Sequence, residues 1–219
     1  MRLAAALALL LAAPAAAQDF IPARGLLSDK EFHRIVSCGA PVYGRCAIEP
    51  RAWPRDVALD VSVSRLQDVD PVSSALSAQV DLAIDQAISQ INGAGARLQL
   101  YRLPDNRPAR VHVSVRSPRS LTILTGEKHH RDLPGGMVVF AMSDAGEIDR
   151  VNIFINSGVG LSEVRSILLE ELTQGMGLPY DISDPEYRRR SIFSQETNAV
   201  TVLTGQDAAV LRLHYPPTD

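Results

Sequence analysis

The order of the apolar patterns between residues 57 and 156 restricts the fold more than any other feature of the chain. Apolar and polar residues alternate from 57 to 63, which is the period of a strand with one buried face. From 76 to 91 the apolar residues recur every three or four positions, as in an amphipathic helix. Segments with strand character then begin at positions 97, 110, 136 and 147. This order predicts an α+β domain with five strands.

Helix boundaries can be predicted from capping residues. Asp70 and Pro71 predict the start of the long helix, because Asp caps helix N-termini and Pro fits the first turn. A second main helix is predicted from about 162 to 175. Gly175 and Gly177 are expected to end it by permitting a left-handed turn.

The segments at the two ends of the chain carry simpler signals. Thr204 as N-cap and Asp207 three residues later form a variant of the capping box, so a final helix is predicted there. Residues 18–56 contain several prolines and one short helical candidate that begins after Ser28. We expect these residues to form an N-terminal extension over a domain of residues 57–219.

The first residues have the pattern of a secretory signal peptide. Arg2 precedes an uninterrupted apolar run from 3 to 13, and Pro14 and an Ala-x-Ala site follow, which predicts cleavage after Ala17. The run is too short to cross a membrane, which takes about 20 residues. We therefore expect a bacterial protein that is periplasmic or secreted and has no membrane span.

The charge balance argues against one class of partner. Acidic residues outnumber basic ones by 25 to 22, and a nucleic-acid-binding protein would need a basic surface. The one dense basic cluster, at 188–190, is interpreted as part of a solvated loop. We therefore expect no nucleic-acid partner.

Two cysteines, Cys38 and Cys46, flank the segment CGAPVYGRC, which is rich in turn-forming residues. Exported proteins form disulfides, and turns can bring the two ends of this segment together. The sequence therefore predicts one disulfide that closes a short loop. Two separate free thiols are the alternative.

The stretch LLEELTQGMGLPYD, at 168–181, carries the strongest functional signal. A helix advances about 100° per residue, so Glu170, Glu171 and Gln174 fall on one flank and can converge. Their spacing is that of the H-E-x-x-H helix of zinc proteases, in which two His bind the metal and the Glu activates a water. Glu170 and Gln174 occupy the His positions, and Glu171 occupies the base position. Two exposed acids on an ordinary helix are the alternative.

The same stretch is similar to a metzincin zinc site whose ligands have been replaced. Gly177 has the spacing of the glycine in the longer H-E-x-x-H-x-x-G-x-x-H motif. The third-ligand position falls on Tyr180, beside Asp181. In the sequence SIF at 191–193, Phe193 takes the place of the methionine in the Met-turn beneath the metal.

Residues 57–217 resemble an exported bacterial family known as domain of unknown function 2927. Its most specific segments are EELTQGMGLPYD, SIF and LTGQDAAVLRLHYPP. The resemblance implies a zincin- or metzincin-like fold with a mixed five-stranded sheet, two main helices and a small C-terminal lobe. The strand GMVVFAM would be the antiparallel edge over a cleft. The cleft would contain Glu170, Glu171, Gln174, Tyr180, Asp181 and Phe193.

The replaced ligands decide which function we expect. Zinc sites use His nitrogen, Cys sulfur and carboxylate oxygen, whereas a set of Glu170, Gln174 and Asp181 suits a hard cation such as calcium better. We therefore expect no cofactor and a non-catalytic protein that binds a peptide or protein in the cell envelope, or serves as a scaffold. The alternative is a metal-dependent peptidase or hydrolase of unusual ligands, in which those three residues hold a divalent cation and Glu171 is the base.

Other candidate sites carry weaker signals. His129 and His130 lie in a polar stretch and are interpreted as solvated. The sequence GVG at 158–160 matches half of a dinucleotide-binding pattern, but Glu163 stands at the third glycine position. We interpret it as a turn that leads into a helix.

Overall fold

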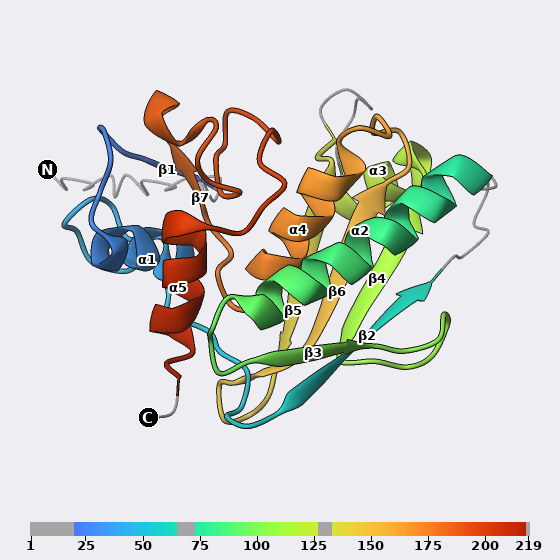
Figure 1. Ribbon diagram of the computed structural model, residues 1–219, viewed down its shortest axis with the longest axis horizontal. Helices are drawn as coiled ribbons and strands as arrows, with labels where there is room; N and C mark the ends of the chain where they lie inside the picture. Colours follow the sequence, from blue (N-terminus) through green and yellow to red (C-terminus); the bar gives the residue numbers. More distant parts are fainter. Residues whose placement is uncertain (1–19, 65–72, 127–132, 218–219) are drawn as a thin grey trace, which may run out of the picture.

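A computed structural model describes residues 20–64, 73–126 and 133–217, which form a layered α+β fold (Figure 1). A sheet with helices on one face makes up the larger lobe, and two short helices with a small sheet make up the other. The predicted signal peptide lies outside the described residues, and so do His129 and His130. None of the described helices is both long and apolar enough to span a membrane.

The main sheet has five strands in the order β3-β2-β4-β6-β5. Neighbouring strands are parallel from β3 to β6, and β5 runs antiparallel to β6 at the edge. The predictions of a mixed five-stranded sheet and of an antiparallel edge strand are thus confirmed. The strands are β2 (Ala58–Ser64), β3 (Gln99–Arg102), β4 (Val111–Arg116), β5 (Gly136–Met142) and β6 (Ile148–Asn156).

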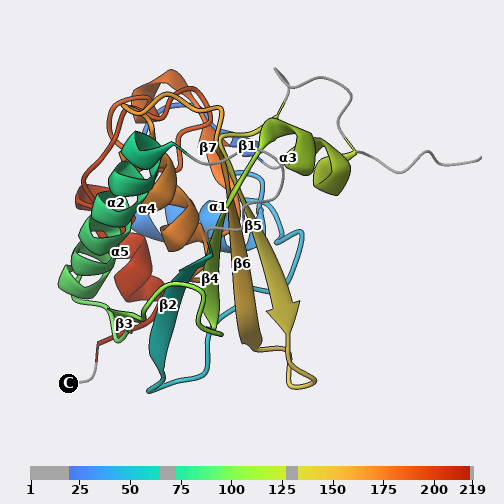
Figure 2. The same ribbon diagram turned by 90° about the vertical axis from the view of Figure 1, so that its right-hand side faces the viewer.

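The core lies between the sheet and two helices that pack against each other, α2 (Ser74–Gly93) and α4 (Val164–Gln174) (Figure 2). Val111 and Val113 of β4 are buried, whereas His112 between them is partly exposed. Such alternation places the branched side chains on one face of the pleated strand. Burying one of them contributes about 1.5–3 kcal/mol, which explains why the alternating segments fold as strands.

The long helix begins later than the sequence analysis predicted. Ser73 is the N-cap of α2, and its side chain accepts a hydrogen bond from the backbone N–H of Leu76. Asp70 and Pro71, which were predicted to start the helix, lie outside the described residues. A serine hydroxyl three positions before an amide satisfies that donor as well as an aspartate does, so Ser73 can serve as the cap.

Helix α3 (Pro118–Thr125) was not predicted. The side chain of Ser117 caps it, Pro118 occupies its first turn, and Gly126 ends it in the left-handed conformation. Of its described residues only Leu121 is a buried hydrophobic. A helix with so little buried surface has no apolar periodicity from which it could be predicted. Its capping residues, Ser117 and Gly126, are nevertheless typical of helix ends.

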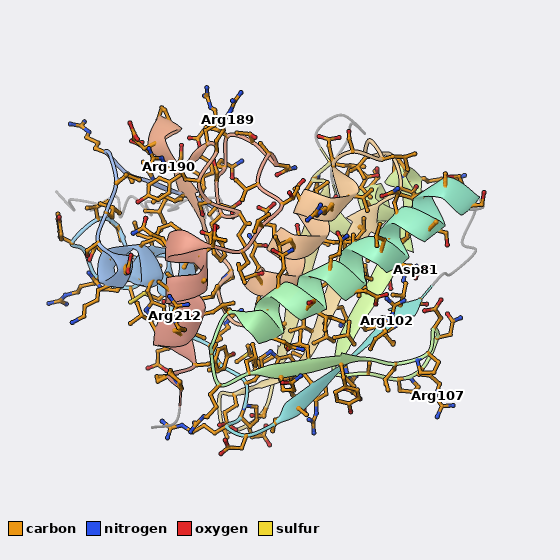
Figure 3. The ribbon with its side chains drawn as sticks, in the orientation of Figure 1. Asp81, Arg102, Arg107, Arg189, Arg190 and Arg212 are labelled. Atoms are coloured by element: carbon orange, nitrogen blue, oxygen red, sulfur yellow. A yellow bond between two sulfur atoms is a disulfide. The ribbon has the colours of Figure 1, made fainter. Side chains whose placement is uncertain are left out.

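Arg102 connects the β3 edge of the sheet to α2 (Figure 3). Its guanidinium lies 2.9 Å from Asp81 and 3.3 Å from Asp85, both on α2, and 3.1 Å from Asp105. Partly exposed ion pairs of this kind each contribute at most about 1 kcal/mol. The cluster therefore fixes the position of β3 more than it stabilises the fold.

The smaller lobe joins the two ends of the described chain. Strand β1 (Phe20–Pro22) pairs in parallel with β7 (Asp181–Ser183), and α1 (Asp29–Cys38) packs against α5 (Gly205–His214). The ring of Phe32 in α1 stacks on Tyr187, in the short 3-10 helix Pro185–Tyr187, at 5.2 Å between ring centres. The N-terminal segment is therefore built into this lobe.

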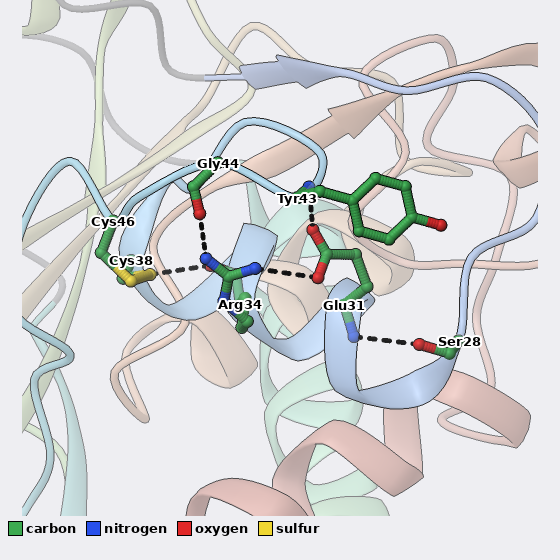
Figure 4. A network of polar contacts seen from close by, with 7 residues as sticks. All are labelled: Ser28, Glu31, Arg34, Cys38, Tyr43, Gly44 and Cys46. Atoms are coloured by element: carbon green, nitrogen blue, oxygen red, sulfur yellow. Dashed lines mark hydrogen bonds and ion pairs between the residues drawn. A yellow bond between two sulfur atoms is a disulfide. The ribbon is translucent and has the colours of Figure 1, made fainter.

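The predicted helix after Ser28 and the predicted disulfide are both confirmed. The Ser28 side chain accepts a hydrogen bond from the backbone N–H of Glu31, and Cys38 is bonded to Cys46 with their Cα atoms 5.1 Å apart. Glu31 and Arg34 hold the enclosed loop (Figure 4). The Glu31 carboxylate accepts from Tyr43 N–H, and the Arg34 guanidinium donates to the Gly44 carbonyl.

Candidate binding cleft

A cavity of about 790 Å³ lies between the edge strand β5, the helix α4 and the segments that follow α4. One wall consists of β5 and the residues before it, and the floor is the polar flank of α4. The opposite wall comes from the start of β7 and from the segment after SIF. The polar side chains that line the cavity are Thr125, Glu170, Glu171, Gln174, Asp181, Ser194, Gln195 and Asn198.

Helix α4 presents its polar flank to the cavity because its apolar residues face the core. Leu168, Leu169 and Leu172 are buried, so the side chains of Glu170 and Glu171 project from the remaining flank. Glu170 is half-buried, and Glu171 is only 6% exposed. The alternative of two exposed acids on an ordinary helix is therefore wrong.

Glu171 lies against the backbone of β5 at Gly136. A Cβ atom placed on Gly136 would be 2.3 Å from Oε1 of Glu171, so only glycine permits this approach. The other carboxylate oxygen, Oε2, is buried and has no hydrogen-bond partner among the described residues. An unsatisfied buried acceptor of this kind is costly. It marks Glu171 as a residue whose position serves something other than packing.

Burial and neighbouring carboxylates raise the pKa of both glutamates in the cavity. Burial raises the pKa of Glu171 well above its ordinary value, and the nearby Asp181 carboxylate raises it further. Burial also raises the pKa of Glu170, with smaller contributions from Asp181, Glu171 and Asp207. Each glutamate therefore keeps its proton at a pH where an exposed glutamate would have lost it.

Gln174 joins α4 to the far wall of the cavity. Its Nε2 donates a hydrogen bond of 2.8 Å to Oδ1 of Asp181. Asp181 is the first residue of β7 and pairs with Phe20 of β1. The strand pairing in the smaller lobe therefore fixes the position of a carboxylate in the cavity.

The turn between α4 and β7 depends on close contacts with distant segments. Gly175 keeps a right-handed backbone, so the prediction of a left-handed turn there is wrong, but Gly177 does adopt a positive φ of 97°. A Cβ on Gly177 would lie 2.0 Å from the Arg51 carbonyl oxygen. The indole N–H of Trp53 donates to the Gly175 carbonyl at 3.0 Å, and the hydroxyl of Tyr215 donates to the Met176 carbonyl at 2.6 Å.

Asp207 of α5 holds the SIF turn from within the core. Its carboxylate accepts hydrogen bonds from the Ser191 hydroxyl at 2.6 Å and from the Ile192 N–H at 2.9 Å. Burial raises the pKa of Asp207 to about 7, although both hydrogen bonds act in the opposite direction. Thr204 is the N-cap, as predicted, but makes no side-chain capping bond. The predicted capping-box role of Asp207 is wrong, because its side chain points toward Ser191 instead.

A family model described as "Protein of unknown function (DUF2927)" matches residues 49–218. The chain belongs to the DUF2927 family. A search of curated proteins finds no match. The part of this DUF2927 protein that the model matches includes every residue that lines the cavity. It also includes Trp53, which lies before the segment that carried the resemblance.

Two residues predicted for the cleft of this DUF2927 protein do not line the cavity. The Tyr180 ring covers Gly39 at the end of α1, where a Cβ would lie 2.7 Å from its Cζ atom. Phe193 is fully buried, with its ring edge-on to that of Phe32 at 6.0 Å between centres. Tyr180 therefore lies against the C-terminal end of α1, and Phe193 packs on the ring of Phe32 in α1.

Part of the cavity wall in this DUF2927 protein was not predicted from the sequence. Gly135 and Gly136 form the lip at the start of β5, and Ser194, Gln195 and Asn198 form the opposite wall. The two glycines could have predicted this part of the wall, because glycine next to a strand often marks a close backbone approach. Within the described ranges, no three His, Cys, Asp or Glu side chains form a group that could hold a metal ion.

Proposed function

We propose that this DUF2927 protein works in the cell envelope or outside the cell by binding an extended peptide, or a segment of a partner protein, in the cavity below β5. The observation that carries this proposal is the open edge of the sheet beside the cavity. An extended peptide can add to such an edge as a further strand, with backbone hydrogen bonds that give affinity and pockets that give specificity.

The register of β5 indicates which backbone groups are available. The N–H of Asn156 donates to the Gly135 carbonyl at 2.9 Å, and residues of an antiparallel pair alternate between facing their partner strand and facing away. Gly136, Val138 and Phe140 therefore direct their N–H and C=O groups away from β6. All three also line the cavity, so a strand added there would lie over it.

The resemblance of the site to a metzincin zinc site with replaced ligands supports binding without hydrolysis. Glu170 and Gln174 stand where the zinc-binding histidines would be, and the amide nitrogen of Gln174 is bonded to Asp181. Glu171, in the base position, is turned against Gly136. Without histidine ligands for zinc, Glu171 has no Lewis acid to activate a water beside it, so the binding function is favoured over the metal-dependent hydrolase.

A peptide library screened against the mature protein tests the proposal, with NMR chemical-shift mapping of the best binders. We expect perturbations at Gly136–Phe140 and along the polar flank of α4. Val138→Pro removes an outward-facing donor from an edge strand, where proline is tolerated, and should weaken binding about 10-fold. Val138→Ala keeps the N–H group and serves as the matched control.

Two results would contradict the proposal. Perturbations confined to surfaces remote from β5 and α4 would mean that the cavity is not the binding site. Cleavage of library peptides that is lost on dialysis against a chelator and restored by a divalent cation would favour the hydrolase instead. In that case Glu171→Gln should abolish the cleavage.

A further inference from the structure

The charged side chains that line the cavity within the described ranges are all acids. Glu170, Glu171 and Asp181 contribute carboxylates, and the amide nitrogen of Gln174 is already engaged with Asp181. Within the described ranges, no lysine, arginine or histidine lines the cavity. A ligand that complements the three carboxyl groups must bring hydrogen-bond donors, and a positive charge would strengthen each of these hydrogen bonds.

Glu171 provides the second and independent indication of a ligand. Glu171 is only 6% exposed, and its Oε2 atom has no partner among the described residues. Burying a carboxyl group without a hydrogen-bond donor is unfavourable. A cationic donor would satisfy this oxygen and would favour its ionised form.

The geometry of an added strand would bring a side chain to these acids. A strand paired with β5 would lie about 4.8 Å from it, with its side chains pointing alternately to the two faces of the sheet. Side chains opposite Gly136 and Val138 would face α4 and the acids. Met137, Phe140 and Ile167 add apolar surface to the cavity, against which a long aliphatic stem can pack while its charged end reaches the carboxylates.

We propose that the cavity binds one arginine or lysine side chain from the peptide strand that pairs with β5, so that the ligand class is an extended basic peptide. This inference rests on the proposed function and specifies its ligand. A metal ion is the rival occupant of an acidic site. The described carboxylates do not form a three-residue metal-binding group, which favours the organic cation.

The decisive experiment compares peptides that differ only in charge. One probe is a blocked peptide of alternating valine and threonine with a central arginine, and its partner carries citrulline, the neutral analogue of the same shape. A second pair carries lysine or acetyl-lysine. Calorimetry on the mature, disulfide-bonded protein should show about 10-fold tighter binding of the charged member of each pair, which is the size of a charge-assisted hydrogen bond.

Matched variants connect this preference to the cavity. Glu171→Gln and Glu170→Gln keep the side-chain shape and should each reduce the preference for arginine over citrulline severalfold. Asp149→Asn changes an exposed acid of β6 that is not part of the cavity and should leave the preference unchanged. Thermal unfolding of each variant shows that the fold is intact.

The outcomes separate this inference from the proposed function. Equal affinity for arginine and citrulline peptides, with shifts still mapping to β5, overturns the cation inference and leaves peptide binding standing. Failure of every peptide to bind in the cavity overturns both. Displacement of the arginine peptide by calcium chloride, but not by sodium chloride of the same ionic strength, would show that the acids hold a metal ion and would overturn the inference.

Discussion

Glu171 is a buried acid whose pKa is higher in the folded protein than in the unfolded chain, so folding stability must depend on pH. The folded state binds the carboxyl proton of Glu171 more tightly than the unfolded chain does. Its stabilising contribution is complete below the ordinary pKa of 4.5 and is lost as the pH rises through the folded value. Asp207, with a pKa raised from 3.8 to about 7, acts in the same direction. These two carboxyl groups therefore contribute less stability as the pH rises from about 4 to 7.

Glu171→Gln should remove one part of this dependence. Glutamine has the same shape and carries no charge, so the variant should gain stability relative to the wild type as the pH rises above 4.5, by at most about 1.4 kcal/mol per pH unit. Urea unfolding from pH 4 to pH 8 measures the difference. A constant difference over that range would mean that Glu171 ionises as freely in the folded protein as in the unfolded chain.

The cavity residues that could be predicted are those fixed by local geometry. Helical spacing alone places Glu170, Glu171 and Gln174 on one flank, and the structure has them there. The directions of Tyr180 and Phe193 depend instead on packing against α1, more than a hundred residues earlier in the chain. No local pattern carries that information, so a positional match to a motif did not predict where these side chains point.

Among the structural elements, the turn after α4 has the most restrictive geometry. Gly177→Ala would place a methyl group against the Arg51 carbonyl in a backbone conformation that alanine avoids. We expect it to lower the free energy of unfolding by more than about 3 kcal/mol. Gly93→Ala is the control, because a Cβ there meets no atom and alanine suits a helix better. Guanidinium unfolding of both variants tests this, and equal effects would contradict it.

Elements were predictable where they bury a periodic face over several turns or strand pairs. All five strands of the main sheet, α1, α4 and α5 were predicted within a few residues. Strands β1 and β7 have only three residues each and exist because they pair with one another. Each strand forms only against a partner about 160 residues away. The residue pattern within either segment does not indicate that partner.

At the scale of the whole molecule, the disulfide should contribute through the unfolded chain. Closing a loop between cysteines that are eight positions apart restricts the unfolded ensemble and stabilises the fold by about 2–3 kcal/mol. Cys38 is fully buried, so Cys46→Ser is the cleaner substitution. Chemical unfolding should show a loss of that size, and thiol titration of the denatured, unreduced wild type should find no free thiol. Two reactive thiols would contradict the bridge.

The export prediction is a separate property of the whole chain. If cleavage follows Ala17, the mature protein begins at Gln18, two residues before the first described residue. Intact-mass measurement of protein collected from the periplasm or the medium should match that N-terminus. Protein that still carries Met1 would contradict both the cleavage and the signal-peptide interpretation.

The pairing of β1 with β7, and the packing of α1 against α5, determine when the smaller lobe can fold during synthesis. A ribosome makes the N-terminal partner of each pair first and the C-terminal partner last, so the smaller lobe must wait until residues near 214 have emerged. Contacts this distant in sequence also form slowly, because a long loop has to close first. A chain still being synthesised is therefore left unfolded around its N-terminal segment, which is the state that a translocation channel accepts. Nascent chains arrested before Gly205 should accordingly be cut by protease within residues 20–48, whereas the finished chain resists.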